Sequence, residues 1–502
     1  MTPPRPGARR QAAVAAGSAA AARSAAEVLA AGGNAADGAV AGGLAAAVAE
    51  PGLTSLGGGG FALVREPAGA EHLLDFFVDA PGRGLGPDAR EPHFTDVVVQ
   101  FPSAAQHFHV GWGSVAVPGC LDGYLRLHRD RGRLSLDAVT APARRLAREG
   151  VIAEPAQEAV VQLLHAVLTL TDDGARLFPV AAGAAPGALR LRNPQYADLL
   201  AKVAAGTVTG FASEPLLSAT TEAMARNGGL VTVADLQAYE PVGREPLLTS
   251  FRGARVATNA LPSFGGAILA DAFAELASLE AGRRSDELPA APHVVAALAA
   301  ATARQKQQAV TAVPQSTQGT THLSVVDGDG LMVSMTTSNG SCSGVFAPGS
   351  GVQLNNVMGE RDLHPWGFHA LPPGTRVGSM MAPTIVDLPD GSVVALGSGG
   401  SERIRSALLQ TMLRLVAGDD LATAVMAPRV HWDGSVVQTE PGLSADVLAS
   451  LAATGPVNVW SAPDLYFGGV NAVQRHPDGR VTAVGDPRRG GVALVVPQPD
   501  EG

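Results

Sequence analysis

Thr320 stands where a threonine could act as a nucleophile. It follows Gly319, and a polar segment at 302–318 with few aliphatic residues precedes both. This segment is interpreted as an exposed linker. A threonine hydroxyl is a weak nucleophile until a base removes its proton. Cleavage of the Gly319–Thr320 bond would give Thr320 a free α-amine with a pKa of about 7.7–8.0, and that amine can serve as the base.

A predicted β-hairpin positions this threonine. The turn at 327–330 carries Asp-Gly between two β-branched runs, which is typical of hairpins. A two- or four-residue loop would place Thr337 opposite Thr320, with the two Cβ atoms about 4.5–5.5 Å apart. A three-residue loop would place Thr336 or Ser338 there instead. Each register puts a hydroxyl opposite Thr320, although two facing threonines are by themselves an ordinary cross-strand pair.

Other segments predict the elements around the hairpin. Residues 19–31 are strong helix formers that end at Gly32-Gly33, and Asn34 can cap a second Ala-rich helix. The four glycines at 57–60 precede a strand-like run with no Lys-Ser/Thr pair, so they indicate a tight turn beside a cleft and not a phosphate-binding loop. Residues 250–259 predict one strand, and the C-terminal third predicts short strands joined by tight turns.

The composition excludes several classes of protein. The chain has 502 residues, a net charge of −10 and charged residues at 16%, below the average of about 25%. This acidic balance provides no basic face for nucleic acid. Two isolated cysteines, Cys120 and Cys342, exclude a disulfide framework and argue against a zinc site, and no metal or cofactor is expected.

No membrane span is expected either. The apolar stretch at 39–49 is shorter than the ~20 residues that cross a bilayer. Arg9 and Arg10 precede an Ala-rich run that invites an export-signal interpretation, but Arg23 and Glu27 interrupt the run, which continues as a helix. A cytoplasmic protein is the prediction.

Several motifs in order resemble the γ-glutamyltransferase family of N-terminal-nucleophile hydrolases, over about residues 11–495. The motifs are Gly32-Gly33-Asn34-Ala35-Ala36-Asp37, Glu50-Pro51 with the run from Gly57 to Phe61, Val117-Pro118-Gly119, Pro142-Ala143, Pro262-Ser263-Phe264-Gly265-Gly266, Thr320-Thr321-His322, Leu354-Asn355-Asn356 and Asp486-Pro487-Arg488. The resemblance implies an α+β fold, a four-layer αββα sandwich. It also implies a precursor that cleaves itself between Gly319 and Thr320.

The resemblance further implies one continuous domain made of two associated chains, a large segment at 1–319 and a small segment at 320–502. Thr320 would attack a substrate carbonyl and pass the acyl group to water or an amine, and Thr337 or Ser338 would steady its new amine. The oxyanion hole, a pair of backbone amides, would be Gly399 with Gly400, or Gly400 with Ser401. Such donors contribute about 3–4 kcal/mol to transition-state stabilisation.

The residues that match the family's glutamyl-binding positions are mostly altered. Phe77 stands where an Arg grips the substrate α-carboxylate, which removes a charge-assisted clamp. Val357 replaces a Gln or Glu, whereas Glu360 keeps the acidic residue three positions further on. The Ser-Ser-Met segment reads Gly378-Ser379-Met380, and Asn339 matches an Asn contact if one residue is deleted nearby. The resemblance therefore implies a rebuilt, more apolar substrate pocket.

Three functions remain open from the sequence. The first is a self-processing hydrolase or acyltransferase that acts on a small acyl or amide substrate other than a simple γ-glutamyl compound. The second applies the same nucleophile to a C–C bond next to a carbonyl, as is thought of family homologues in antibiotic pathways to 4-alkylproline units. The third is a non-catalytic binding protein, which the intact motif at Thr320 disfavours.

Overall fold

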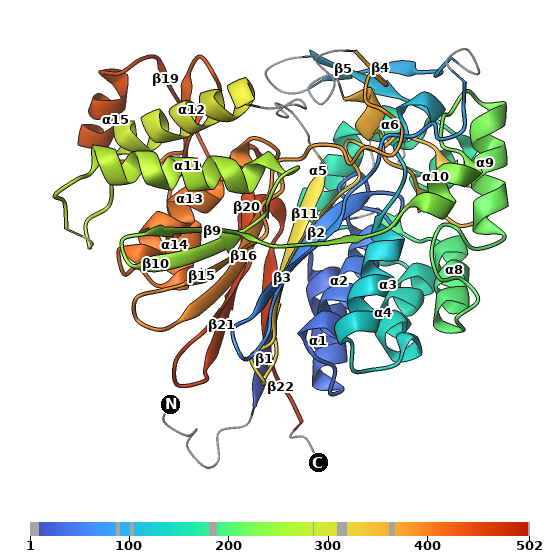
Figure 1. Cartoon of the computed structure of the whole chain (residues 1–502), viewed down its shortest axis with the longest axis horizontal. Helices are drawn as coiled ribbons and strands as arrows, with labels where there is room; N and C mark the ends of the chain where they lie inside the picture. The colour runs from blue at the N-terminus through green and yellow to red at the C-terminus, as the bar shows by residue number, and fades with distance from the viewer. Residues whose placement is uncertain are drawn as a thin grey trace.

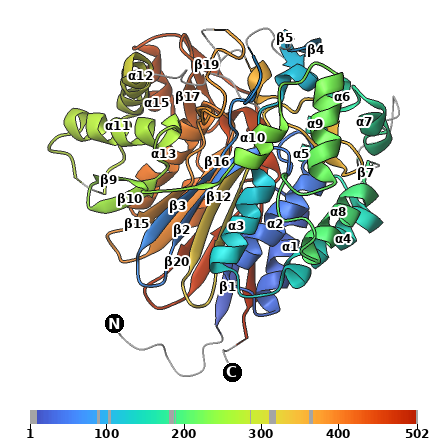
Figure 2. The ribbon, with the colours of Figure 1, turned by 45° about the vertical axis from the view of Figure 1, so that its right-hand side comes forward.

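The computed structural model describes residues 10–86, 91–100, 105–179, 187, 189–284, 286–308, 319–360 and 367–499. Two β-sheets lie face to face, and helices cover the outer face of each (Figure 1). The turned view shows the same order of helix, sheet, sheet and helix layers (Figure 2). The predicted αββα sandwich is confirmed.

The seven-stranded sheet holds the start of the predicted small segment at its centre. Its strand order is β22-β1-β11-β12-β2-β3-β8. The strands are β22 (Val492–Pro497), β1 (Gln11–Ala16), β11 (Thr320–Val326), β12 (Met332–Ser338), β2 (Gly59–Arg65), β3 (Glu71–Phe76) and β8 (Val242–Arg244). Every residue of β11 and β12 is buried, because helices cover one face of this sheet and the second sheet covers the other.

The six-stranded sheet has the order β21-β20-β16-β15-β10-β9. Its strands are β21 (Val481–Val484), β20 (Gly469–Arg475), β16 (Val393–Gly399), β15 (Thr384–Asp387), β10 (Ala254–Thr258) and β9 (Leu247–Phe251). Smaller sheets comprise β4 (Thr95–Gln100) with β5 (Ala105–Val110), β6 (Val151–Ile152) with β7 (Arg190–Leu191), β13 (Phe346–Ala347) with β14 (Val352–Gln353), and β17 (Val430–Trp432), β18 (Val437–Thr439) and β19 (Val457–Val459).

Helices of the N-terminal half include those that cover the seven-stranded sheet, and later helices include those that cover the six-stranded one (Figure 1). The first set is α1 (Ala19–Ala30), α2 (Ala35–Ala49), α3 (Cys120–Arg131), α4 (Leu136–Glu149), α5 (Pro155–Leu163), α6 (His165–Leu168), α7 (Asp172–Leu177), α8 (Pro194–Ala204), α9 (Leu216–Arg226) and α10 (Val233–Ala238). The second is α11 (Phe264–Leu279), α12 (Ala291–Gln308), α13 (Arg403–Val416), α14 (Leu421–Met426) and α15 (Ala445–Ala452).

Local chemistry explains the two N-terminal helices. Asn34 caps α2 and forms a capping box with Asp37, as its place after Gly32-Gly33 predicts. Small side chains let α1 and α2 pack closely, so that α2 is buried on nearly all sides. In the described part of the chain, no helix is long and apolar enough to cross a membrane. Arg9 lies outside the described residues.

Two sequence predictions of elements are wrong. Residues 250–259 hold the end of β9, a turn and β10 instead of one strand, because Arg252 and Gly253 both adopt positive φ angles, 48° and 87°, and turn the chain. The predicted linker at 302–318 is helical as far as Gln308, since Thr302 and its neighbours pack as the last turns of α12. The remainder of that segment lies outside the described residues.

Candidate active site

The turn of the β11–β12 hairpin decides which hydroxyl faces Thr320. The side chain of Asp327 accepts hydrogen bonds from the backbone N–H groups of Asp329, Gly330 and Leu331, at 2.9–3.0 Å. Gly330, at φ 95°, completes a three-residue loop. Thr320 therefore pairs with Ser338. The predicted pairing with Thr337 is wrong, and the three-residue alternative with Ser338 is what the structure has.

Ser338 links the candidate nucleophile to the candidate cleavage site. Its hydroxyl donates to the Gly319 carbonyl oxygen at 2.5 Å and accepts from the Gly340 N–H at 3.1 Å. The Thr320 hydroxyl lies 3.4 Å from the same Ser338 oxygen. The Ser338 hydroxyl thus polarises the Gly319 carbonyl, and the Thr320 hydroxyl lies beside that of Ser338. This arrangement is suited to intramolecular acyl transfer.

Gly319 fills a space that admits no side chain. A Cβ at this position would stand 1.9 Å from the carbonyl oxygen of Gly340 and 2.1 Å from that of Gly52. Both obstacles are backbone atoms, so a larger residue has to displace the chain. This displacement would move the Gly319 carbonyl away from Ser338.

We expect Gly319→Ala to slow self-cleavage about 10²-fold, because a misplacement of about 1 Å can cost that much. The fraction of full-length chain on denaturing gels after timed incubation measures the effect. Gly243→Ala is the matched control, because a Cβ on Gly243 would meet no atom within 4 Å. Cleavage of Gly319→Ala at the wild-type rate would show that this contact does not position the carbonyl.

The opposite face of the hairpin carries a second hydroxyl cluster. Thr337 pairs with Thr321, and the Thr337 hydroxyl lies 2.8 Å from that of Thr54. Glu50 accepts a hydrogen bond from Ser18 at 2.7 Å. Thr321 and Glu50 both lie against Gly17, at 2.4 and 2.7 Å from the place of a Cβ. Glu50 of the Glu50-Pro51 motif thus packs beside Thr321, on the face of β11 opposite to Thr320.

Burial raises the pKa of Glu50 from 4.5 to about 7, an effect that the hydroxyls of Thr321 and Ser18 offset in part and the charge of Glu154 reinforces. A raised carboxyl pKa stabilises the folded state below pH 4.5, and this stabilisation is lost as the pH rises to 7. It amounts to about 3 kcal/mol. In the Thr320→Ala background, we expect the free energy of unfolding to fall by this amount relative to Glu50→Gln between pH 4 and pH 8. Parallel denaturant-unfolding profiles for the two proteins would contradict this.

A small cavity adjoins the nucleophile. It is lined by Thr320, Phe77, Ser338, Gly340, Val357, Glu360, Gly378, Ser379, Met380, Met381 and Ile404. Its volume of about 10 Å³ holds about one water molecule. Five of the six predicted substrate-binding residues lie on this wall. The wall residues that were not predicted are Gly340, Met380, Met381 and Ile404, and none carries a polar side chain that would have singled it out.

Asn339, the sixth predicted substrate-binding residue, is fully buried and does not line the cavity. Its side-chain amide donates to the Leu354 carbonyl oxygen at 3.4 Å. Its backbone N–H donates to the Leu53 carbonyl oxygen. Asn339 therefore fastens the end of β12 to its surroundings, and contact with substrate stays a prediction.

Phe77 places an aromatic ring at the position that matches the family's carboxylate-binding Arg. Its ring stacks on Phe61, with ring centroids 5.7 Å apart. The adjacent cation, Arg376, forms ion pairs with Asp75 and Asp79 at 3.3 and 2.8 Å. Because Arg376 is already neutralised, it does not replace the missing Arg.

The predicted oxyanion segment lies directly beside Thr320. A Cβ on Gly399 would stand 2.3 Å from the Thr320 carbonyl oxygen, so only glycine permits this approach of β16 to β11. Gly400 has a φ of 122° and Ser401 a φ of 57°, both in the region that favours glycine. The chain turns sharply here before α13 begins, and the choice between the Gly399–Gly400 and Gly400–Ser401 pairs stays a prediction.

His322 shares a strand face with Thr320 but serves the core. Its ring nitrogens hydrogen-bond Thr336 and Ser324, both at 2.8 Å. Burial lowers its pKa from 6.5 to about 3, which keeps the ring neutral. In the described part of the chain, no group of three or more His, Cys, Asp or Glu side chains could hold a metal ion.

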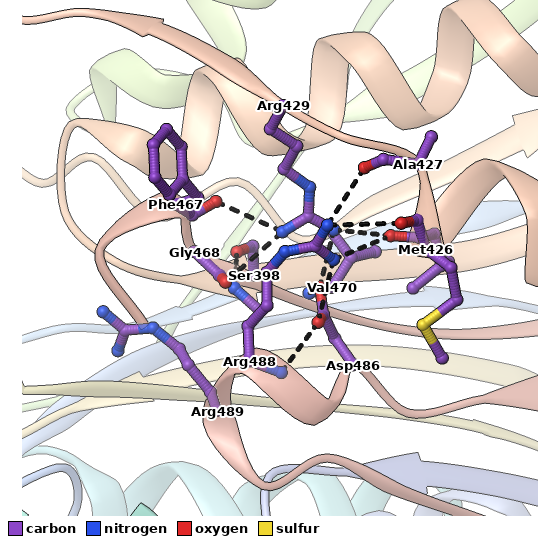
Figure 3. A network of polar contacts seen from close by, with 12 residues as sticks. Ser398, Met426, Ala427, Arg429, Phe467, Gly468, Val470, Asp486, Arg488 and Arg489 are labelled. Carbon is purple, nitrogen blue, oxygen red and sulfur yellow. Dashed lines mark hydrogen bonds and ion pairs between the residues drawn. The ribbon is translucent and has the colours of Figure 1, made fainter. Parts of the chain in front are cut away.

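An ion network anchors the six-stranded sheet next to the candidate oxyanion segment at 399–401 (Figure 3). Asp486 pairs with Arg429 at 2.6 Å and accepts from the Val470 N–H at 3.0 Å. Arg429 also donates to the carbonyl oxygens of Phe467 and Gly468. Since β20 pairs with β16 as far as Gly399, the motif at Asp486 fixes the strand that carries the candidate oxyanion amides.

The fold and the hydroxyl cluster at the start of β11 define the class of N-terminal-nucleophile hydrolases. The family model described as Gamma-glutamyltranspeptidase matches residues 21–310 and 290–496, and the chain belongs to this family of hydrolases and transferases. The proposal of a non-catalytic homologue is set aside.

Individual relatives agree with this assignment. Acylase ACY 1 proenzyme of Pseudomonas sp. (strain V22) is 31% identical over 495 residues, covering 90% of this chain and 88% of the relative. Glutathione hydrolase proenzyme of Escherichia coli (strain K12) is 28% identical, with 88% and 84% covered. The crystal structure of cephalosporin acylase from Bacillus halodurans superposes with a TM-score of 0.75 at 27% identity, over 98% of this chain and 99% of that one.

Proposed function

We propose that the chain cleaves itself between Gly319 and Thr320 and then acts as an N-terminal-threonine hydrolase or acyltransferase. The observation that carries this proposal is the hydrogen bond from Ser338 to the Gly319 carbonyl, with the Thr320 hydroxyl beside it. The names of two relatives, both proenzymes, support it.

In self-cleavage, the Thr320 oxygen attacks the Gly319 carbonyl carbon and the C–N bond breaks, so the acyl group moves from nitrogen to oxygen. Water then hydrolyses this ester, giving a carboxylate on Gly319 and a free amine on Thr320. In turnover, that amine takes the Thr320 hydroxyl proton as the oxygen attacks the substrate carbonyl. Backbone amides at 399–401 would stabilise the oxyanion.

The acyl group would bind in the cavity beside Thr320. Its wall is largely apolar, through Phe77, Val357, Met380, Met381 and Ile404. The cavity has room for about one water molecule, and we propose that it opens when a substrate binds. We propose that the substrate is an acyl or amide compound other than a simple γ-glutamyl one. Hydrolysis of a C–C bond next to a carbonyl stays a prediction.

We expect γ-glutamyl anilide to be turned over weakly or not at all, because Phe77 stands where an Arg would bind its α-carboxylate and Arg376, the neighbouring cation, is paired with Asp75 and Asp79. An anilide with an apolar acyl group, such as phenylacetyl anilide, is expected to react faster. Release of the chromophore measures both rates, and mass spectrometry of the chain that begins at Thr320 detects the acyl-enzyme. Robust γ-glutamyl turnover would refute the role given to Phe77 and Val357.

A further inference from the structure

Arg489 lies over the candidate oxyanion segment. A Cβ on Gly399 would stand 3.3 Å from one terminal nitrogen of Arg489, and a Cβ on Gly400 would stand 3.4 Å from the other. The same point at Gly399 is 2.3 Å from the Thr320 carbonyl oxygen. Figure 3 shows Arg489 turned away from the ion network formed by its neighbour Arg488. The guanidinium therefore lies beside Gly399 and Gly400 and not in the ion network around Asp486.

Arg403 joins Arg489 at this place. Its Nε donates to the Tyr466 carbonyl oxygen at 3.1 Å, and its guanidinium stacks on the Tyr466 ring at 4.9 Å. The Arg489 Nε likewise donates to a carbonyl oxygen, that of Leu465, at 3.1 Å. Among the described residues, no carboxylate oxygen lies within 4.0 Å of either guanidinium, whereas Arg429 and Arg488 both have such partners.

The two cations repel one another. Burial lowers the pKa of Arg489 to about 10, and the charge of Arg403 contributes to the shift, which the acidic groups Asp486 and Asp464 oppose. A further cation close by, Arg405, is buried and has Glu402 at 3.7 Å as its carboxylate neighbour. This concentration of positive charge stands out in a chain of net charge −10. An anion between Arg403 and Arg489 would relieve the repulsion and take charge-assisted hydrogen bonds.

We propose that Arg489 and Arg403 bind a carboxylate on the amine half of the substrate. This inference rests on the proposed function and names its substrate class: amides whose leaving amine carries a carboxylate, such as N-acyl amino acids. The acyl half is assigned to the cavity beside Phe77, which neither arginine lines. Both arginines border the amides at 399–401, since a Cβ on Gly400 would stand 3.4 Å from a terminal nitrogen of Arg489 and 3.6 Å from the Cβ of Arg403. We therefore assign the leaving group to this side.

Matched amides test this assignment on the processed protein. Benzoylglycine and benzoylglycinamide share an acyl group and differ in the carboxylate, and benzoyl anilide reports acyl transfer with a neutral leaving group. We expect kcat/KM for benzoylglycine to exceed that for the amide by about tenfold or more, and added salt to reduce the preference. Arg489→Gln and, separately, Arg403→Gln should remove it, while Arg489→Lys should restore part of it.

Arg480→Gln is the control, because Arg480 is an exposed residue paired with Asp478. Separation into two chains checks that each variant folds. A wild type without the preference, or arginine variants that keep it while cleaving benzoyl anilide normally, would overturn the inference and leave the proposed function standing. If none of the three compounds is cleaved, calorimetry decides: benzoylglycine must bind the wild type at least about tenfold more tightly than benzoylglycinamide, and binding of equal strength would overturn the inference.

Discussion

Thr320→Ala is expected to remain a single 502-residue chain and to lose turnover by about 10⁴-fold or more. The substitution removes the oxygen that we propose attacks both the Gly319 carbonyl and the substrate. Because Thr320 is buried at the start of a paired strand, the shorter side chain should leave the fold intact. Denaturing gels and anilide assays measure the two losses.

Thr320→Ser separates chemistry from structure in this experiment. Serine keeps the hydroxyl and, after cleavage, the amine, so we expect slower but detectable processing and turnover. Thr320→Ala that is still cut at residue 319, or that still turns over acyl anilides, would show that another group is the nucleophile.

Ser338→Ala is expected to slow self-cleavage by about 10²–10³-fold, the usual effect of removing one donor to a developing oxyanion. The Ser338 hydroxyl is the donor to the Gly319 carbonyl, and it also lies beside the Thr320 hydroxyl. The rate at which purified precursor converts into two chains gives the effect directly.

Thr337→Val provides the matched comparison from the next residue of the same strand. The Thr337 hydroxyl points to the other face of the hairpin and hydrogen-bonds the Thr54 hydroxyl. Removing it leaves the buried Thr54 hydroxyl without this partner, which lowers the free energy of unfolding by about 1–3 kcal/mol. We expect Thr337→Val to be processed faster than Ser338→Ala. The reverse order would assign the steadying role to Thr337.

The sequence predicted the sandwich and most of the cavity wall. Ordered motifs placed Phe77, Val357, Glu360, Gly378 and Ser379 in one site, and the structure brings all five to one cavity. Their roles toward substrate stay predictions. A family pattern can do this because it records positions that a shared fold brings together.

Features that depend on exact geometry were not predictable. The hairpin register depended on Asp327, whose side chain holds a three-residue loop that the Asp-Gly pattern alone does not distinguish from shorter or longer ones. The approach of Arg489 to Gly399 joins segments about 90 residues apart through the pairing of β16 with β20. Likewise, no local pattern shows that Glu50 is buried behind Thr321.

N-terminal sequencing and intact-mass measurement of the purified wild-type protein test self-cleavage most directly. We expect two chains that stay associated under native conditions, 1–319 and 320–502, with Thr320 as the first residue of the second chain. A protein that stays at full length after prolonged incubation, or one cut at a different bond, would contradict the assignment of Thr320 as an N-terminal nucleophile.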